Sequence, residues 1–235
     1  MRVTEASSGV YQIHFPGTSY LAAFSGREFT NAERGDFLSV LGLSEDSLYR
    51  VKQVHGKKVV RVERGHPKEP RIEADGLHTH EPGVILGILT ADCVPVFFRD
   101  PVHQAVGLAH AGWRGIHVGI IQEMVQALIE SYGTQPKDLK ITFGPAIREC
   151  CYEVGPEFCE YFPERCHKRV SASKELFVAD LAGAVTDILL ERGVQAGSIV
   201  DTKICTSCQN DKFFSARKDR GTSERILSVI RISKL

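Results

Sequence analysis

Two short apolar runs lie close together in the middle of the sequence, at Gly83–Leu89 and Val94–Phe98. Both have the length of a strand and are bounded by Gly, Pro or Asp, which is typical of β-structure. A continuous apolar run, in place of alternating apolar and polar residues, is typical of a strand buried on both faces. The two runs therefore predict a sheet that is covered on both sides.

Further short segments rich in Val, Ile or Phe predict strands at Gly9–His14, Ser19–Phe24, Leu48–Val54, Lys58–Val62, Ala105–His110, Lys140–Phe143 and Ile199–Thr202. Apolar residues at helical spacing predict helices over Gly119–Tyr132 and Phe177–Arg192, and a third is expected near Asn31–Leu41. Predicted strands outnumber helices and do not alternate strictly with them, which favours an α+β fold over a doubly wound sheet. No linker divides the chain, so one domain over residues 1–235 is expected.

The charge balance, the lack of long apolar stretches and the number of cysteines indicate which partners and which cellular compartment to expect. Lys and Arg number 29, and so do Asp and Glu, which gives no sign of a nucleic-acid partner. The longest apolar stretch is too short to cross a bilayer and the N-terminus does not read as a secretory signal, so a cytoplasmic protein without a membrane partner is expected. The seven cysteines are odd in number, which favours reduced thiols over a disulfide framework.

Three segments place ligand-type side chains at the ends of predicted strands, where folds often carry function. They are Gln53–Gly56, Thr90–Pro95 and His110–Gly115. His55, Cys93 and His110 would supply two imidazoles and a thiolate, and catalytic zinc sites keep three protein ligands with a fourth position open. The spacing leaves two alternatives, namely hydrogen-bonded histidines beside a core thiol, and a Cys–His nucleophile pair.

Other motifs have both a chemical and a structural interpretation. Cys205-Thr206-Ser207-Cys208 is a CxxC element suited to zinc or redox chemistry, but no second CxxC exists to close a four-sulfur site, and a structural role is favoured. His78-Thr79-His80 could bind a metal if both rings shared a strand face, but a solvated turn is expected. Phe213 and Phe214 could stack a base, with nearby Arg217 on phosphate, or form a core pair beside a charged loop.

Six ordered segments resemble the YfiH-type family, whose members are known as laccase-domain proteins and as multi-activity purine nucleoside phosphorylases. The matching segments are KQVHG (52–56), EADGLHT (73–79), ILTADCVPVFFRD (88–100), LAHAGWRG (108–115), GPAIRECCYEVG (144–155) and CTSCQNDKFFSARKDRGTSERILSVI (205–230). The resemblance implies a layered α/β/β/α sandwich of mixed sheets, similar to the catalytic domain of cytotoxic necrotizing factor. It also implies metal ligands at His55, Cys93 and His110, phosphorolysis of adenosine, inosine and methylthioadenosine, and adenosine deamination.

The chain departs from the family pattern at three places. Arg148-Glu149 stand where the family usually has Gly-Pro, Ala216 replaces a Tyr, and residues 222–225 replace the usual TGR. The metal ligands are intact. The departures therefore concern the end of the site that contacts base or phosphate, where specificity can differ.

Phosphorolysis requires a site that holds a phosphate dianion, positions the sugar and stabilises the departing purine. The expected substrate contacts are Gln53, a phosphate-binding cation among Arg114, Lys203 and Arg217, and a base-flanking ring from Phe213 or Phe214. Deamination requires a carboxylate that moves a proton beside the zinc, for which Asp92 and Asp75 are candidates. In a regular strand Asp92 would point away from Cys93, and a turn at Asp92 would remove that objection.

Three rival functions stay open at this stage. The first is copper-dependent oxidation of phenols, although a multicopper oxidase uses many paired HxH motifs and this chain has nine histidines and one HxH. Copper(II) could still occupy the zinc ligands. The second is a metal-free hydrolase with Cys93 as nucleophile and His110 as base, and the third is a non-catalytic metal-binding or partner-binding module. The expected partners are a nucleoside and phosphate, and a monomer or a homodimer is expected.

Overall fold

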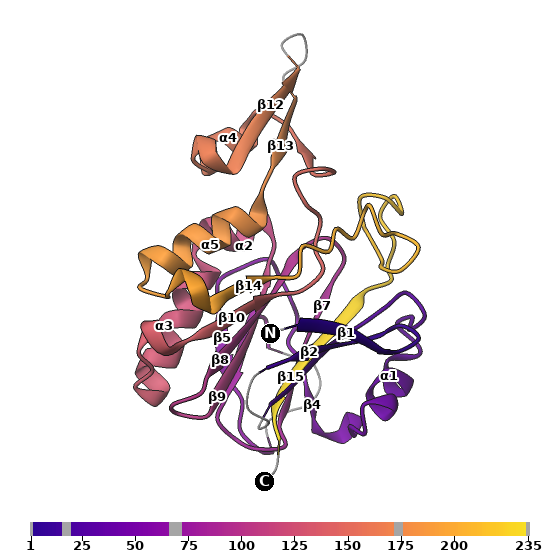
Figure 1. Cartoon of the computed structure of the whole chain (residues 1–235), viewed down its shortest axis with the longest axis vertical. Helices are drawn as coiled ribbons and strands as arrows, with labels where there is room; N and C mark the ends of the chain where they lie inside the picture. The colour runs from indigo at the N-terminus through magenta and orange to yellow at the C-terminus, as the bar shows by residue number, and fades with distance from the viewer. Residues whose placement is uncertain (1, 16–19, 66–71, 172–175, 234–235) are drawn as a thin grey trace.

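Two six-stranded sheets form the body of the computed structural model, which describes residues 2–15, 20–65, 72–171 and 176–233 (Figure 1). The first sheet has the strand order β1-β2-β3-β15-β7-β4, and the second has the order β14-β10-β8-β9-β6-β5. The first comprises β1 (Arg2–Ser7), β2 (Val10–His14), β3 (Tyr20–Ser25), β4 (Leu48–Tyr49), β7 (Ile85–Thr90) and β15 (Ile226–Ile232). The second comprises β5 (Val59–Arg61), β6 (Gly76–Thr79), β8 (Val94–Asp100), β9 (Ala105–Ala111), β10 (Lys140–Phe143) and β14 (Ile199–Asp201). Both sheets are mixed, because each combines antiparallel pairs with a parallel pair such as β4 with β7 or β5 with β6.

Helices cover the outer face of each sheet. Helix α1 (Arg34–Val40) packs on the first sheet, whereas α2 (Trp113–Val118), α3 (Ile120–Tyr132) and α5 (Leu181–Glu191) pack on the second. Three apolar clusters fill the spaces between these layers, one under α1, one between the two sheets, and one under α2, α3 and α5. The expected α+β fold with α/β/β/α layering is confirmed.

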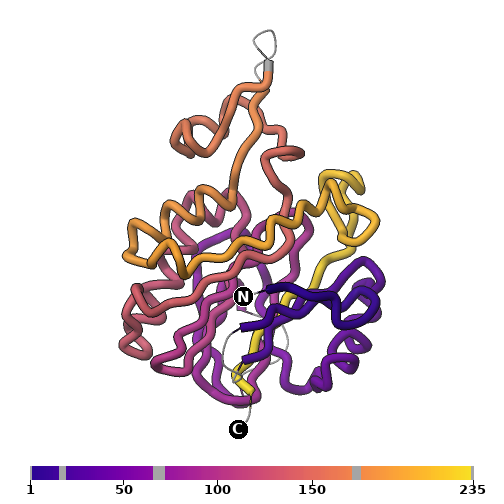
Figure 2. Tube along the Cα trace, viewed as in Figure 1, coloured from indigo at the N-terminus to yellow at the C-terminus, as the bar shows by residue number. Residues whose placement is uncertain are grey.

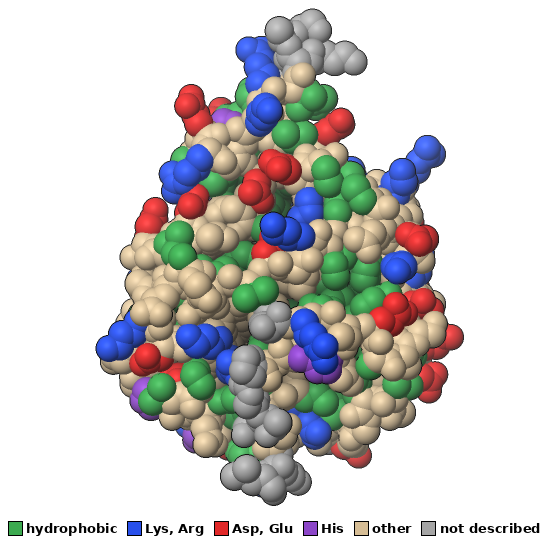
Figure 3. Space-filling view, viewed as in Figure 1, with side chains coloured by type: hydrophobic (Ala, Val, Ile, Leu, Met, Phe, Trp, Pro, Cys, Tyr) green, Lys and Arg blue, Asp and Glu red, His purple; other side chains and the backbone are tan. Residues whose placement is uncertain are grey.

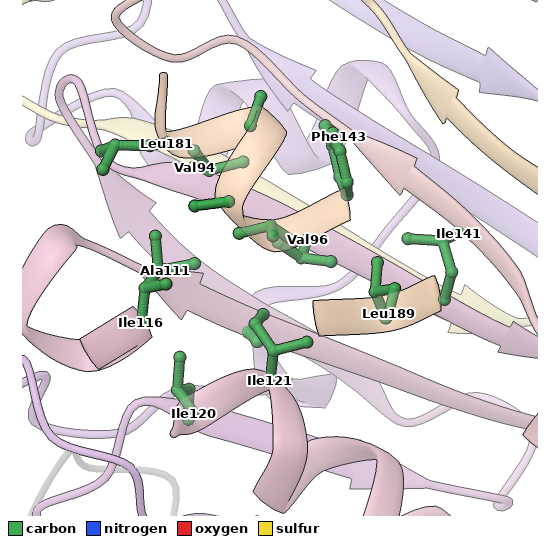
Figure 4. Close-up of a cluster of buried hydrophobic side chains, with 14 of the residues drawn as sticks. Val94, Val96, Ala111, Ile116, Ile120, Ile121, Ile141, Phe143, Leu181 and Leu189 are labelled. Atoms are coloured by element: carbon green, nitrogen blue, oxygen red, sulfur yellow. The ribbon is translucent and has the colours of Figure 1, made fainter. Parts of the chain in front are cut away.

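The central strands are apolar on both faces, as the sequence predicts. In β8, Phe97 faces the first sheet, whereas Val96 and Phe98 face the helices. Successive side chains of a strand point to opposite faces, so a strand between two layers needs apolar residues at every position. Figure 4 shows the helix side of this arrangement, with Val94 and Val96 of β8 beside residues of α3 and α5.

A small three-stranded sheet forms an arm that projects from the body (Figures 1 and 2). It consists of β11 (Glu153–Val154), β12 (His167–Ser171) and β13 (Leu176–Ala179), with α4 (Glu157–Tyr161) packed beside it. The segment between β10 and this arm, residues 144–152, contributes to the site described below.

Several sequence predictions need correction. The helix predicted from Phe177 begins at Leu181, because the Asp180 side chain accepts the N–H of Gly183 at 2.8 Å and caps it, while Phe177 belongs to β13. The strand predicted over 48–54 ends at Tyr49, and Ser19, predicted to begin another strand, lies outside the described residues. The elements that were not predicted are strands β1, β6, β11, β12, β13 and β15 and helices α2 and α4.

The HxH motif does not form the expected solvated turn. His78 and Thr79 are buried in β6, and His78 Nδ1 lies 2.9 Å from the Tyr132 hydroxyl of α3. The His80 ring lies 5.1 Å from the same tyrosine ring. Burial lowers the pKa of His78 to about 4, so this imidazole is neutral near pH 7. Both histidines of the motif therefore contact Tyr132 of α3, where this helix packs on the second sheet.

Acidic and basic side chains are interspersed over the face drawn in Figure 3, in line with a formal net charge of zero. Within the described part of the chain, no helix combines the length and the apolar character that a membrane crossing requires.

Candidate metal centre and substrate cavity

The fold brings His55, Cys93 and His110 together. His55 follows β4 in a loop, Cys93 directly precedes β8, and His110 lies near the end of β9. One ligand atom from each residue lies within 4.8 Å of the others, and His55 Nε2 is 3.9 Å from Cys93 Sγ. The centroids of the two imidazole rings are 4.7 Å apart. Three donors that are distant in the sequence therefore converge on one point.

Two residues in left-handed backbone conformations make this convergence possible. Asp92 has φ of 90° and His55 has φ of 59°, a region that non-glycine residues visit at a cost of about 1 kcal/mol or more. Asp92 lies in the turn where the chain passes from β7 of the first sheet to β8 of the second. The regular strand that would have turned Asp92 away from Cys93 is therefore absent over residues 91–93.

Asp75 is fully buried behind the two histidines and positions both. Its Oδ1 lies 2.8 Å from His110 Nδ1 and accepts the His55 N–H at 3.0 Å. Its Oδ2 accepts the backbone N–H groups of Gly56 at 2.7 Å and Val54 at 3.2 Å. A carboxylate on Nδ1 fixes the ring so that Nε2 is available to a ligand. Asp75 does not line the cavity described below, so the geometry gives it a positioning role in place of the predicted proton transfer.

The electrostatics of the cluster favour a thiolate. Burial raises the pKa of Cys93, but the charge of His110 and hydrogen bonds to His110 and His55 outweigh burial and hold this pKa at about 6. Burial lowers the pKa of His110, but the Cys93 thiolate and the hydrogen bond to Asp75 raise it to about 9. Zinc binds cysteine as the thiolate and histidine as the neutral imidazole, so an ion bound here would take over the thiolate and displace the proton that the pair holds at neutral pH.

Gly112 lies directly against two of the three donor side chains. A Cβ atom at this position would lie 2.9 Å from Cys93 Sγ and 2.9 Å from His55 Cδ2, so only glycine leaves both ligands in place. Two imidazoles and a thiolate are a donor set that zinc prefers, and three ligands leave a coordination position open. The residues present therefore fit the metal that the sequence resemblance implies.

Replacing Gly112 with alanine should weaken zinc binding. The new methyl group must push Cys93 or His55 away, and affinity should fall by about 10- to 100-fold, the range seen when a metal ligand loses its orientation. Competition with a chromophoric chelator measures this change. Gly56→Ala is the matched control, because its Cβ would meet its nearest neighbour at 3.6 Å, an ordinary contact. Equal zinc affinity in the two variants would contradict this account of Gly112.

His55, Cys93 and His110 line a cavity of about 700 Å³. Its walls carry the aromatic rings of Trp113 and Tyr152, and Asp92 is the one carboxylate among the described lining residues. Its cationic lining residues are Arg50, Lys52, Arg114, Arg217, Arg220 and Arg225. An excess of cations around apolar and aromatic surface suits an anion together with a flat ring system.

Three of the predicted substrate residues line this cavity. Arg114 lies over the Trp113 ring, with Cζ 4.3 Å from the ring centroid. Arg217 donates to the Glu153 carbonyl at 2.7 Å, and its Cζ lies 5.3 Å from the Tyr152 centroid. Gln53 also lines the cavity, but its amide pairs with the backbone N–H and carbonyl of Leu89 at 2.8 Å each. Gln53 therefore ties its loop to β7, and its polar atoms already have partners.

Three other predicted residues lie away from the cavity. Phe213 is buried against Tyr11 and Phe24, with ring centroids 5.0 and 6.0 Å apart. Phe214 is also buried, and Lys203 is exposed outside the cavity lining. The core interpretation of the Phe pair is therefore the one that the structure bears out.

Trp113 and Tyr152 are the aromatic residues at the cavity, and neither was predicted to act there. Both lie inside segments that carry the family resemblance, LAHAGWRG and GPAIRECCYEVG. An aromatic residue that directly follows a metal-ligand loop was the signal that could have identified Trp113.

Asp92 uses both carboxylate oxygens to hold the loop over the cavity. Its Oδ1 accepts the Thr206 hydroxyl at 2.7 Å, and its Oδ2 accepts the backbone N–H of Arg217 at 2.7 Å. These bonds join the turn beside Cys93 to residues 206–217. Asp92 therefore positions Arg217 relative to Cys93.

Comparisons with known proteins agree with the family resemblance found in the sequence. A family model described as multi-copper polyphenol oxidoreductase laccase matches residues 26–233. The chain is 39% identical over 191 residues to the purine nucleoside phosphorylase YlmD of Geobacillus stearothermophilus, covering 76% of this chain and 70% of that protein. It is 31% identical over 224 residues to the human purine nucleoside phosphorylase LACC1, covering 86% of this chain but only 50% of that longer protein. The crystal structure of the Bacillus licheniformis hypothetical protein YfiH superposes with a TM-score of 0.92 at 26% identity, over 98% of this chain and 99% of that chain.

Proposed function

The chain belongs to the multi-copper polyphenol oxidoreductase laccase family, and from this premise we propose that it is a zinc-dependent purine nucleoside phosphorylase. One observation carries the proposal: His55, Cys93 and His110 line the same cavity as six cationic side chains and two aromatic rings. Relatives named purine nucleoside phosphorylase support it. The substrates are adenosine, inosine or methylthioadenosine, together with phosphate.

In phosphorolysis a phosphate oxygen forms a bond to the ribose C1′ while the bond from C1′ to the purine nitrogen breaks. The electron pair of that bond leaves with the purine, which takes up a proton. Arg114 and Arg217 neutralise the phosphate dianion and orient it, because both line the cavity and each lies beside an aromatic ring. Trp113 and Tyr152 offer flat apolar surface to the purine.

His55, Cys93 and His110 would hold the zinc, which supplies a Lewis acid with an open coordination position when bound. Asp75 keeps the His110 ring in one orientation through its bond to Nδ1. Asp92 holds the Arg217 backbone in place through a hydrogen bond. The position of Arg217, which binds the anion, is therefore fixed relative to Cys93, which binds the metal.

Product analysis tests the proposal directly. The zinc-loaded chain is incubated with adenosine, inosine or methylthioadenosine, with and without phosphate, and the products are separated by chromatography. The expected result is free purine and ribose 1-phosphate (its methylthio analogue from methylthioadenosine), formed only when phosphate is present. Absence of free purine from all three nucleosides, in a preparation shown to contain zinc, would overturn the assignment.

Adenosine deamination is the less supported half of the predicted activity. It requires a carboxylate that exchanges a proton with the attacking water. Asp92 is the carboxylate among the described lining residues, and Thr206 and Arg217 already occupy its two oxygens. We therefore expect inosine formation from adenosine without phosphate to be much slower than phosphorolysis in the same assay.

A metal-free hydrolase is the second candidate, because Asp75, His110 and Cys93 form the ordered series of carboxylate, imidazole and thiol that nucleophilic catalysis uses. His55 argues against it, since a nucleophile needs one base and here a second imidazole also faces the sulfur. A hydrolase would keep its activity in a chelator and lose it to a thiol alkylator. A zinc phosphorylase would lose its activity in the chelator and regain it with added zinc.

Copper oxidation of phenols is the least supported alternative. In the described residues, His55, Cys93 and His110 are the one cluster of metal-ligand type that contains histidine, and the HxH motif packs against Tyr132. Met124, the internal methionine that could act as an axial copper ligand, is buried against Gly76 and Gly107 in the core. Copper can still bind these donors in place of zinc.

We propose a cytoplasmic location, which the seven free thiols support.

Removing either arginine beside the aromatic rings should weaken phosphate binding. Arg114→Ala and Arg217→Ala should each raise the KM for phosphate by about 10- to 100-fold, the equivalent of one charge-assisted hydrogen bond, with a smaller effect on the KM for inosine. Lys203→Asn is the control: it removes a cation outside the cavity, and asparagine tolerates the left-handed conformation (φ 55°) of this residue. An unchanged phosphate KM in both arginine variants would contradict the assignment.

A further inference from the structure

Four cysteine sulfurs gather at a second place, outside the cavity lining. Cys150 and Cys151 come from the loop after β10, and Cys205 and Cys208 come from the turn after β14. All four Sγ atoms lie within 4.8 Å of one another. The Cys151–Cys208 distance is 3.3 Å, Cys150–Cys208 is 3.5 Å and Cys150–Cys205 is 3.6 Å. Cys150 and Cys151 thus supply the two further sulfurs that the CxxC element needs for a four-sulfur site.

These distances match a single tetrahedral ion better than the other uses of clustered thiols. Zinc–sulfur bonds of about 2.3 Å place the four sulfurs of a tetrahedron about 3.8 Å apart. A disulfide would bring two sulfurs to about 2.0 Å, and all four cysteines are free. A cubane iron–sulfur cluster holds its four thiolates on four separate irons, and therefore farther apart than this group.

The backbone holds the two cysteine segments together independently of any ion. The Ala146 N–H donates to the Ile204 carbonyl at 3.2 Å, and the Thr206 N–H donates to the Ala146 carbonyl at 3.1 Å. The guanidinium of Arg148 binds both oxygens of Asp201 at 2.7 and 3.0 Å and the Ile204 carbonyl at 3.2 Å. Arg148 is one of the departures from the family pattern, and here it joins the segments that carry the thiols.

The sulfur of Cys205 also has the surroundings of a metal ligand. Cys205 is buried, and the backbones of Cys208 and Arg148 hydrogen-bond to its side chain. Hydrogen bonds from backbone N–H groups stabilise a thiolate at a metal site. Cys150 and Cys208 are exposed, so an ion can reach the cluster from solvent.

We propose that Cys150, Cys151, Cys205 and Cys208 form a second metal site, a closed four-thiolate site that binds one zinc ion. Four protein ligands leave no open position, so the ion is structural. The ion links two segments of the chain that form the cavity. Ile147 and Tyr152 flank the first cysteine pair and line the cavity, and Thr206 within the CxxC element donates a hydrogen bond to Asp92, which also lines it. This site does not depend on which reaction the cavity catalyses.

Metal counting and cobalt substitution test the site. The full chain, purified under reducing conditions, should contain two zinc ions per chain. Cys205→Ser combined with Cys208→Ser should contain one, and so should His55→Ala combined with Cys93→Ala. Cys159→Ser, a thiol outside both clusters, should keep two. With cobalt(II), the intense absorption of a four-thiolate site should disappear in the first double variant and persist in the second.

Alkylation of the wild-type chain tests the site without any risk of misfolding. With zinc bound, the exposed Cys150 and Cys208 should resist a thiol alkylator until a chelator is added, whereas Cys159 should react equally in both conditions. Peptide mass mapping reads each cysteine separately. Equal alkylation of Cys150 and Cys208 with and without chelator, an unchanged zinc content in the variant that combines Cys205→Ser with Cys208→Ser, or a disulfide between Cys151 and Cys208 in the fresh protein would each overturn the proposal.

Discussion

If the proposed function holds, Cys93→Ala is expected to remove zinc from the proposed His–Cys–His site and to lower phosphorolysis by at least about a hundredfold, the scale on which losing one electrostatic stabiliser acts. Cys93 is the charged ligand of the three, and two imidazoles alone hold zinc weakly. The chain should stay folded, because Cys93 is only half-buried and belongs to none of the three apolar clusters. Zinc per chain, circular dichroism and product release measure the three outcomes.

Cys159→Ala is the matched control for this variant. Cys159 Sγ lies 3.4 Å from His167 Nδ1, so it is also a cysteine beside an imidazole, but neither residue lines the cavity. This change should leave zinc content and phosphorolysis as in the wild type. A Cys93→Ala chain that keeps both would contradict the proposed ligand set, whereas one that keeps its zinc and loses activity would favour Cys93 as a nucleophile.

The sequence predicted the middle of the fold well because those strands have few alternatives. Apolar residues at every position of Val94–Phe98 leave neither face for water, so burial between two layers follows from composition alone. Strand β15 was missed although it lies at the centre of the first sheet, between β3 and β7. It has the same apolar character, with Leu227 facing α1 and Ile226 facing the second sheet, but Ser228 and Arg231 interrupt the run.

The site was predicted only as far as its ligand chemistry. Thiolate and imidazole are ligands by their nature, so His55, Cys93 and His110 could be selected from the sequence. The role of Asp75 could not, because a carboxylate that shuttles a proton and one that orients a histidine are the same residue type. Its burial and its hydrogen bonds separate the two roles, and both depend on tertiary structure. The cysteine pair at Cys150 was likewise invisible as a partner of the CxxC element, because the loop after β10 brings it there.

Asp75→Ala is expected to cause a large loss of stability together with a loss of zinc binding. Four donors lose their acceptor at once, namely His110 Nδ1 and the backbone N–H groups of Val54, His55 and Gly56. Removing one partner from a buried charged network costs about 3 to 5 kcal/mol. Urea unfolding in the presence of a chelator measures this cost separately from the stabilisation that the metal itself provides.

Asp75→Asn distinguishes the contribution of this carboxylate to stability from its contribution to zinc binding. The amide keeps the shape and one acceptor oxygen but turns an N–H group toward a donor, so stability should fall less than in the alanine variant while zinc affinity falls about 10- to 100-fold. Glu73→Gln is the control: this carboxylate lies two residues away, and its ion pair with Lys52 is exposed, so stability should change by less than about 1 kcal/mol. If Asp75→Ala unfolds at the same urea concentration as Glu73→Gln and binds zinc like the wild type, then His110 and His55 are held by something other than this buried carboxylate. The ligand geometry would then have to come from the loop backbones alone, although Asp75 Oδ1 accepts the N–H of the left-handed residue His55.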